Sequence, residues 1–248
     1  MPYRIRELDS ITCDLPPADP QFFASDLHAD GPTKANDFTR PHRRAFLWFL
    51  EHEVEADGGN LTLVGDVWEL WQCAWLDIPE WWRERLANYR LLRGNHDSAR
   101  RRPKEYRWPH DVHLDGYDFP GTPVLLAEHG HEADVWNSSL GVVGWTVTAI
   151  AGILERLGWK DVDNWKWKHL RRPTTHPQYL PTQHYLDYAE RRARETKTRL
   201  VILGHTHKPA LAKRPWGIYG NCGCWVSHDY LGSFVRVGEG AVSLCEIV

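Results

Sequence analysis

Short segments spread along the chain carry side chains that could together bind two divalent metal ions. They are Asp26-Leu27-His28, Gly65-Asp66, Gly94-Asn95-His96-Asp97, His129-Gly130-His131 and Gly204-His205-Thr206-His207. Two carboxylates, one amide oxygen and four imidazoles are the ligand mixture that a pair of hard-to-borderline divalent ions requires. Each segment alone is weak support, but their joint occurrence in this order predicts a metal centre.

The predicted ligands divide into two sets that share one carboxylate. Asp26, His28, Asp66 and His207 are expected to enclose one ion, and Asp66, Asn95, His129 and His205 the second. Two cations about 3.5–4 Å apart repel strongly unless a bridging carboxylate and a shared hydroxide lie between them. That hydroxide would attack phosphorus while the ions neutralise charge on the phosphoryl oxygens. The residues therefore predict a two-metal-dependent phosphoesterase.

His96 is predicted to donate a proton to the leaving oxygen, or to stabilise the charge of the transition state, because it follows the ligand Asn95 directly. Glu69 could hold the His96 ring in the required tautomer, and Asp97 is a competing candidate for that role. His131 and Asp30 lie near the cluster in sequence and fit a supporting or structural role as well as a functional one.

The predicted ligands follow short apolar runs of the kind that form buried strands. These runs are Phe22–Ser25, Leu61–Val64, Leu91–Leu92, Val124–Ala127 and Leu200–Leu203. Residues 43–56, between the first two runs, have the apolar spacing of a helix. This alternation predicts an α/β layer architecture, in which ligands bind beyond the carboxyl ends of the strands.

The two ends of the chain differ from this pattern. Ser233–Val237 and Val242–Ile247 alternate apolar and polar residues, which predicts antiparallel strands closing a second sheet. Residues 1–20 contain prolines and weak periodicity, so no regular element is expected there. A single domain is predicted over residues 1–248.

Residues 133–198 interrupt the rhythm of strands and predict a helical cap inserted within the domain. An apolar helix is expected over residues 139–157 and a polar, basic helix over Gln183–Glu195. The apolar side chains around Trp145 could line an acyl-chain groove or lie on a membrane surface. Packing of this helix on the body of the protein is the equal alternative.

Cations near the predicted centre are candidates for substrate binding. Lys168 lies in a stretch that interleaves tryptophans with cations, which suits anionic lipid or the stacking of a base beside phosphates. Arg100 begins the basic run Arg100–Lys104 and could bind a remote phosphate, although a solvated loop explains this run more simply. The predicted substrate-binding residues are thus Arg100, Trp145 and Lys168.

Composition limits the class of protein. The chain has 42% hydrophobic and 25% charged residues and a net charge of −3, which does not indicate nucleic-acid binding. No secretory signal is visible, and the longest apolar stretch, Leu140–Leu154, is shorter than the roughly 18 residues that span a bilayer. Five cysteines do not suggest a disulfide framework. We expect a cytoplasmic protein, with peripheral contact to the inner membrane through the cap.

The ordered motifs resemble those of the calcineurin-like metallophosphoesterases. The resemblance covers residue 21 to about residue 226 and implies a four-layer αββα sandwich with two divalent ions, Mn²⁺ with Fe or Zn as alternatives. The implied reaction is hydrolysis of a phosphomonoester, phosphodiester or pyrophosphate. The early Ser-Asp-Leu-His, the segment from Gly65 to Trp71 and the cap look most similar to UDP-2,3-diacylglucosamine diphosphatases. The chain departs from that group in having His96 for arginine and His131 for aspartate.

Several functions remain open at this level. A phosphoesterase acting on a small or amphiphilic compound is the leading prediction, and a lipid A enzyme resembling UDP-2,3-diacylglucosamine diphosphatase is one alternative. A serine/threonine protein phosphatase or nuclease is another, favoured by a shallow, open site. A scaffold that kept the fold without the chemistry would lack ligands or the proton donor, and this chain lacks none.

Overall fold

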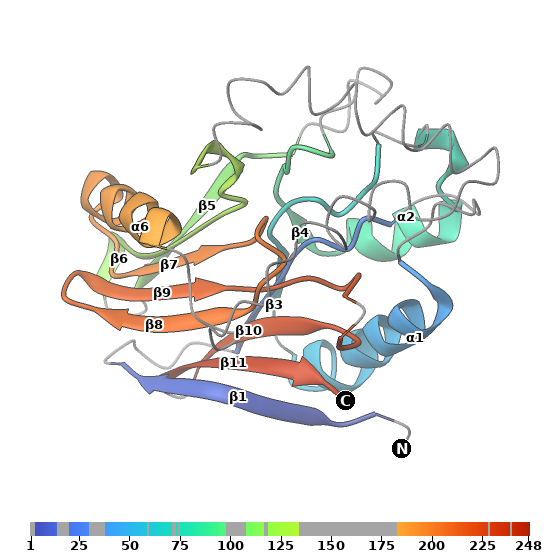
Figure 1. Ribbon diagram of the computed structural model, residues 1–248, viewed down its shortest axis with the longest axis horizontal. Helices are drawn as coiled ribbons and strands as arrows, with labels where there is room; N and C mark the ends of the chain where they lie inside the picture. Colours follow the sequence, from blue (N-terminus) through green and yellow to red (C-terminus); the bar gives the residue numbers. More distant parts are fainter. Residues whose placement is uncertain are drawn as a thin grey trace, which may run out of the picture.

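The computed structural model (Figure 1) describes most of the chain outside one long segment. The described residues are 3–13, 20–29, 38–58, 60–70, 73, 75–97, 108–116, 119–133, 183–227, 229–238 and 240–248. The predicted cap helix over residues 139–157, Asp30, Arg100, Trp145 and Lys168 lie outside them. No helix in the described ranges is long and apolar enough to cross a membrane.

Two mixed β-sheets form the centre of the fold. The first has the order β1 (Ile5–Thr12), β11 (Ala241–Ile247), β10 (Ser233–Gly238), β2 (Gln21–Ala24), β3 (Asn60–Leu63) and β4 (Arg90–Leu91). The second has the order β5 (Asp111–Gly116), β6 (Phe119–Glu128), β7 (Leu200–Leu203), β9 (Gly217–Asn221) and β8 (Ala210–Arg214). The predicted apolar runs form β2, β3, β4, β6 and β7. The expectation that the last two strands close a second sheet was wrong, because β10 pairs with β2 and so extends the first sheet.

Helices cover the outer faces of both sheets. Helix α1 (Arg40–Phe49) continues into one π-helical turn, Leu50–Val54, and with α2 (Glu80–Ala87) packs on the first sheet. Helix α6 (Gln183–Thr196) packs on the second sheet. Short 3₁₀ turns lie at Trp75–Asp77 and His131–Ala133. The predicted αββα layering and the predicted helix over residues 43–56 are confirmed.

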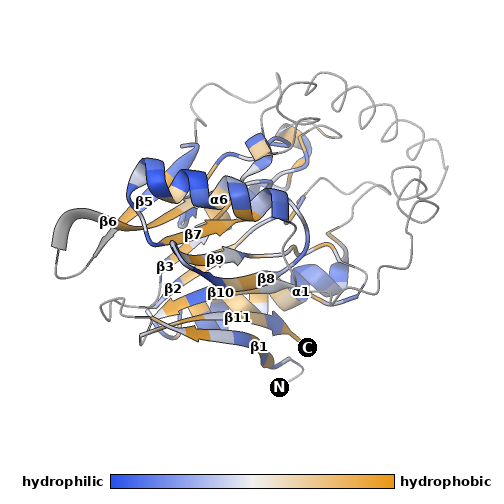
Figure 2. Ribbon diagram, turned by 60° about the vertical axis from the view of Figure 1, so that its left-hand side comes forward, coloured by the Kyte–Doolittle hydropathy of each residue, from blue (hydrophilic) through white to orange (hydrophobic). Residues whose placement is uncertain are grey.

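Strand alternation explains why three apolar layers form. On β2, Phe22 and Ala24 pack toward α1, whereas Phe23 packs toward the second sheet. On β7, Leu200 and Ile202 face the first sheet, while Val201 faces α6. Successive side chains of a strand point to opposite faces, so one strand contributes to two layers. In Figure 2, strands β6 and β7, which pack against α6, are coloured largely hydrophobic, whereas much of α6 itself is hydrophilic.

The topology brings the predicted ligands to one edge of the two sheets. Strands β2, β3 and β4 run parallel, and so do β6, β7 and β9. Parallel strands end at the same edge, so the segments that follow them meet there. This places residues 25–28, 64–66 and 92–97 beside residues 129–131 and 204–207.

The expectation for residues 1–20 was wrong, because β1 pairs with β11 along the edge of the first sheet. A bulge between Glu7 and Asp9 breaks its register: Ile5 packs in the layer toward α1, whereas Leu8 and Ile11, three residues apart, both pack in the layer between the sheets. An edge strand that is mostly exposed and carries a bulge shows no period-2 apolar pattern.

Helix α6 is tied to β6 by a buried carboxylate. Glu128 is fully buried, and the Arg192 guanidinium donates to both of its oxygens at 2.9–3.1 Å. Arg192 also reaches Asp111 on β5. Glu128 directly precedes His129, so this ion pair links α6 to the strand that carries a predicted ligand.

Replacing Arg192 by alanine should destabilise the protein by about 3–5 kcal/mol, because Glu128 would remain as a buried charge without its partner. Arg194 is the matched control: it lies on the same helix and pairs with Glu190, but its side chain is 75% exposed. Arg194→Ala should cost under about 1 kcal/mol. Urea denaturation of both variants measures the difference, and equal costs would contradict the structural role of Arg192.

Candidate metal centre

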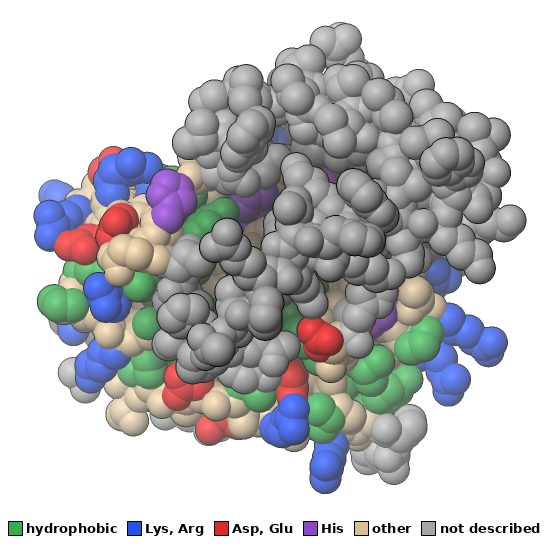
Figure 3. Space-filling model, in the orientation of Figure 1, with side chains coloured by type: hydrophobic (Ala, Val, Ile, Leu, Met, Phe, Trp, Pro, Cys, Tyr) green, Lys and Arg blue, Asp and Glu red, His purple; other side chains and the backbone are tan. Residues whose placement is uncertain are grey.

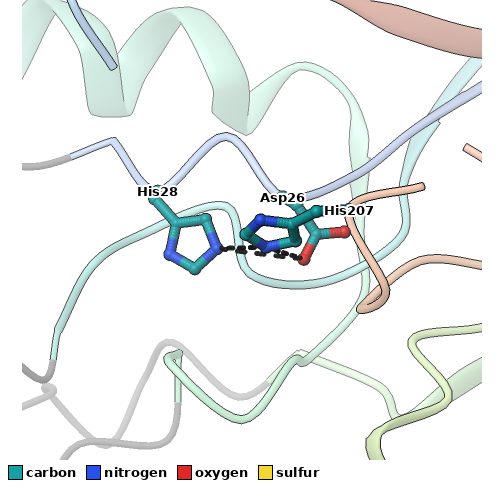
Figure 4. Close-up of side chains that lie close together, drawn as sticks. All are labelled: Asp26, His28 and His207. Carbon is teal, nitrogen blue, oxygen red and sulfur yellow. Dashed lines mark hydrogen bonds and ion pairs between the residues drawn. The ribbon is translucent and has the colours of Figure 1, made fainter. Parts of the chain in front are cut away.

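All seven predicted ligands converge at the carboxyl edge of the strands. Asp26, His28 and His207 form one group whose ligand atoms lie within 4.8 Å of one another, and Asp66, His129 and His205 form a second. The Asn95 side-chain oxygen lies 3.2 Å from Nε2 of His129, which places it with the second group. Figure 4 shows the first group, with both rings and the carboxylate directed toward one another.

Both aspartates use one oxygen for the fold and turn the other toward the cluster. Asp66 accepts the backbone N–H of His96 at Oδ1, while its Oδ2 lies 3.1 Å from Nε2 of His129. Asp26 accepts the N–H of His205 at Oδ2, while its Oδ1 lies 3.2 Å from Nε2 of His207. In each case a backbone amide from a later motif fixes the carboxylate, so its second oxygen is oriented before any ligand binds.

The imidazole rings of His129 and His28 are also fixed by contacts at Nδ1, the nitrogen that faces away from the cluster. His129 donates from Nδ1 to the carbonyl of Val64 at 2.8 Å, which leaves Nε2 facing the cluster as a lone-pair donor. His28 contacts Glu69 through Nδ1 at 2.7 Å, and its Nε2 lies 3.2 Å from Nε2 of His207. Outer hydrogen bonds that fix ring orientation in this way are typical of histidines that bind metals.

Backbone strain is concentrated at the same positions. Within the described ranges, the non-glycine residues with positive φ are Asp26, His28, Asp66, His205, His207 and Lys197, and all but Lys197 are predicted ligands. Such conformations cost about 1–3 kcal/mol each and persist where the surrounding structure imposes them. The fold thus maintains strained turns that direct these side chains inward.

Glycines next to the ligands allow the strand ends to approach closely. A Cβ atom on Gly94 would lie 2.0 Å from Oδ1 of Asp66 and 2.3 Å from its backbone nitrogen. A Cβ on Gly204 would lie 2.6 Å from the Ser25 hydroxyl and 2.8 Å from Oδ2 of Asp26. These glycines are required because Asp66 beside Gly94, and Ser25 with Asp26 beside Gly204, occupy the space that a side chain would fill.

Gly94→Ala should displace Asp66 and destabilise the protein by about 1–3 kcal/mol or more, since neither backbone nor carboxylate can move freely. Gly238 is the matched control, because a Cβ there meets its nearest atom at 3.4 Å. Gly238→Ala should leave stability nearly unchanged. Thermal denaturation and bound-metal analysis of both variants provide the measurement, and a Gly94→Ala protein with native stability and metal content would contradict this view.

The charges of the site favour a bound cation. Burial raises the pKa of Asp26, but His207 and His129 outweigh burial and hold it well below its ordinary value. Asp66 behaves in the same way, mainly because of His129. Conversely, burial lowers the pKa of His129, yet Asp66 and Asp26 raise it to about 9. The carboxylates are therefore ionised, and they attract either protons onto the imidazoles or a metal in their place.

Glu69 contacts two site histidines at once. It lies 2.7 Å from Nδ1 of His96 as well as 2.7 Å from Nδ1 of His28. Burial raises its pKa, but His96 and His28 lower it to about 2, so Glu69 is ionised. The His96 side chain is 18% exposed, which leaves its ring accessible to a substrate.

Asp97, the alternative partner of His96, has a different set of contacts. It accepts the backbone N–H groups of Trp68 and Gly94 at 2.9 and 2.8 Å. Burial and the nearby charge of Asp66 raise its pKa to about 6. The geometry thus favours Glu69 for orienting His96 and gives Asp97 a role in joining the loops after β3 and β4.

The donor set fits divalent ions. Oδ1 of Asp26 is buried and makes no hydrogen bond within the described residues, although ring nitrogens lie 3.2 and 3.8 Å away. The Nε2 atoms of His28 and His207 face each other beside this carboxylate, an arrangement that a bound cation would stabilise. Carboxylate, amide and imidazole ligands suit Mn²⁺, Fe or Zn²⁺.

Two residues near the ligands were not singled out from the sequence. The ring centroid of Tyr185, in the first turn of α6, lies 6.4 Å from that of His205. Tyr230 donates its hydroxyl to the carbonyl of His207 at 3.1 Å. Neither follows a strand of the parallel set, so no sequence signal connected them with the centre.

A model of the family described as "Calcineurin-like phosphoesterase" matches residues 21–209. The chain belongs to the calcineurin-like phosphoesterase family. It is accordingly a metal-dependent phosphoester hydrolase, as the ordered motifs predicted. The matched residues include the seven predicted ligands. No curated protein matches the sequence.

Solved structures similar to the chain share little sequence with it. A predicted phosphoesterase from Streptococcus pneumoniae is 15% identical, with 88% of this chain and 83% of that one covered and a TM-score of 0.43. YfcE, a phosphoesterase from E. coli, is 16% identical, with 89% and 88% covered and a TM-score of 0.42. Vacuolar Protein Sorting 29 from Cryptosporidium parvum is 13% identical, with 94% and 98% covered and a TM-score of 0.46.

Proposed function

We propose that the protein hydrolyses a phosphomonoester, phosphodiester or pyrophosphate with two divalent ions, Mn²⁺ being the first choice. The observation that carries this proposal is the pair of ligand groups meeting at Asp66. Its Oδ2 lies 3.1 Å from Nε2 of His129 in one group and 4.0 Å from Nε2 of His28 in the other. One carboxylate oxygen thus faces imidazoles of both groups, as a bridging ligand must.

The residues of each group would hold one ion. Asp26, His28 and His207 would hold the first, Asn95, His129 and His205 the second, and Asp66 both. Bound in this way, the ions supply Lewis acidity toward the phosphoryl oxygens and lower the pKa of a water molecule.

His96 and Glu69 form the proposed proton-transfer pair. Glu69 contacts Nδ1 of His96, so the Nε2 of that ring is the atom available to a substrate. Held in this orientation, the ring could donate a proton to a leaving oxygen or stabilise charge on the phosphoryl group. The 18% exposure of His96 supports contact with substrate rather than a purely internal role.

The proposal also includes the class of substrate. A small or amphiphilic phosphorylated compound is favoured, with nucleic acid disfavoured by the net charge of −3. Arg100, Trp145 and Lys168 remain proposed substrate contacts, and a substrate resembling UDP-diacylglucosamine is one specific form of the proposal. A cytoplasmic location with peripheral membrane contact through the cap belongs to that same form.

Removal of the metals tests the reaction. Chelated protein should lose turnover of bis-p-nitrophenyl phosphate and p-nitrophenyl phosphate by at least about 10³-fold, and Mn²⁺ should restore it as about two ions bind per chain. A panel of monoesters, diesters and pyrophosphates then identifies the bond that is cleaved. Undiminished activity after chelation would overturn the proposal.

The proposal of a substrate resembling UDP-diacylglucosamine is tested by comparing two compounds. UDP-diacylglucosamine and its deacylated counterpart share the pyrophosphate but differ in acyl chains. Faster turnover of the acylated compound would support a role for the apolar residues around Trp145. Equal rates would remove acyl recognition from the proposal while leaving the phosphoesterase activity intact.

A further inference from the structure

A second group of metal-binding residues lies beside the centre described above. It consists of His110, directly before β5, and His131 with Glu132, in the 3₁₀ turn that follows β6, and we call it the hairpin cluster. Strands β5 and β6 pair with Asp111 opposite Glu128. Continuing this antiparallel register by one residue brings His110 beside His129 and the turn that follows it. The hairpin therefore positions all members of the cluster.

The two imidazoles of the hairpin cluster converge on one carboxylate oxygen. Nε2 of His110 is hydrogen-bonded to Oε1 of Glu132, and Nε2 of His131 lies 3.4 Å from the same oxygen. The three ligand atoms lie within 4.8 Å of one another. Tetrahedral zinc, with bonds of about 2.0–2.2 Å, places neighbouring ligand atoms about 3.3–3.6 Å apart. A small movement of His110 thus suffices to admit the ion.

The surroundings of the cluster also favour a ligand. Nδ1 of His131 is buried and makes no hydrogen bond within the described residues, and Nε2 is the ring nitrogen that lies near Glu132. The side chains of His110 and Glu132 are 34% and 37% exposed, which leaves a path for an ion from solvent. In Figure 3, histidine side chains lie at the surface close to acidic and basic groups on the α6 side of the molecule.

Neighbouring acidic groups are engaged elsewhere. Glu128 and Asp111 both accept from Arg192, so an arginine already balances them. Glu132 instead pairs with His110 and His131. Two neutral imidazoles and one carboxylate form a three-ligand set that binds zinc with one coordination position left open.

We propose that His110, His131 and Glu132 form a third cation site, with a ligand set that Zn²⁺ accepts, next to the two-ion centre. The centroid of the His131 ring lies 5.5 Å from that of His129 and 6.4 Å from that of His205, so the proposed site adjoins the two-ion centre. The open position of this zinc can take water or an anionic oxygen of a compound bound at the centre.

Zinc titration of the full chain tests the site. After dialysis against Zn²⁺, metal analysis should give about three ions per chain, and His110→Ala and Glu132→Gln should each lose about one. His113→Ala is the matched control: His113 lies on the same hairpin with a 38% exposed side chain but outside the cluster, and this variant should lose none.

The failure of either site has its own signature. The Asp66→Asn variant should contain less zinc than the wild type. If adding His110→Ala to that variant removes one more ion, the third site is supported independently of the two-ion centre. If the wild-type chain binds about one zinc that His110→Ala removes, the third site stands and the two-ion centre does not. Zinc content unchanged in both His110→Ala and Glu132→Gln would overturn the third site, because both residues are partly exposed and the variants retain the fold.

Discussion

Asp66→Asn should lower kcat/KM for bis-p-nitrophenyl phosphate by at least about 10³-fold, since it removes the charge that allows two cations to lie side by side. The bound-metal content should fall with the activity. Steady-state kinetics across a range of Mn²⁺ concentrations, together with metal analysis of the same protein, measures both effects.

The expected loss follows from how the two oxygens of Asp66 are used. Oδ1 accepts the N–H of His96, and an asparagine oxygen can keep that bond. The amide NH₂ would then face Nε2 of His129, where Oδ2 now lies 3.1 Å away. A neutral donor in that position repels a cation instead of binding it. The fold should therefore survive while the site loses its shared ligand.

Asp97→Asn serves as the matched control for a buried carboxylate close to Asp66. Asp97 accepts two backbone N–H groups, and an asparagine can accept only through its single oxygen. This change should cost about 1–3 kcal/mol of stability and leave metal binding in place. Asp66→Asn with full metal content and activity would show that Asp66 does not bridge the ions.

The convergence of the ligands was predictable from sequence because each of them ends a strand or follows it closely. Apolar runs before Asp26, Asp66 and His205 identify parallel strands, and parallel strands share one carboxyl edge. Local patterns thus determined which residues meet although they are far apart in the chain. The same reasoning predicted α1 from the spacing of its buried residues.

Contacts between elements were beyond this reasoning. The sequence offered Glu69 as a partner of His96, with Asp97 as the competing candidate, but nothing in it indicated that the same carboxylate also contacts His28, 41 positions away. The hairpin cluster depends on the register of β5 and β6, which apolar patterns do not encode across an irregular pair. The ion pair between Arg192 and Glu128 depends on how α6 packs across the second sheet. Such features follow from packing, which periodicity alone does not contain.

His96→Ala should lower kcat by about 10²–10⁴-fold, the usual contribution of a positioned acid or base. The metal content should stay near that of the wild type, because the ligand groups of Asp26 and Asp66 do not require this ring. Glu69→Gln provides the companion measurement. It should lower metal affinity or activity by about 10–100-fold, since Glu69 orients both His28 and His96.

Leaving-group dependence distinguishes the two roles open to His96. A proton donor matters most when the leaving oxygen is basic, so His96→Ala should slow an alkyl phosphate ester far more than a p-nitrophenyl ester. If His96 stabilises charge on the phosphoryl oxygens, both esters should slow by a similar factor, because that charge develops with either leaving group. Unchanged rates with both esters would remove His96 from the chemistry and leave Glu69 as a residue that acts through His28 alone.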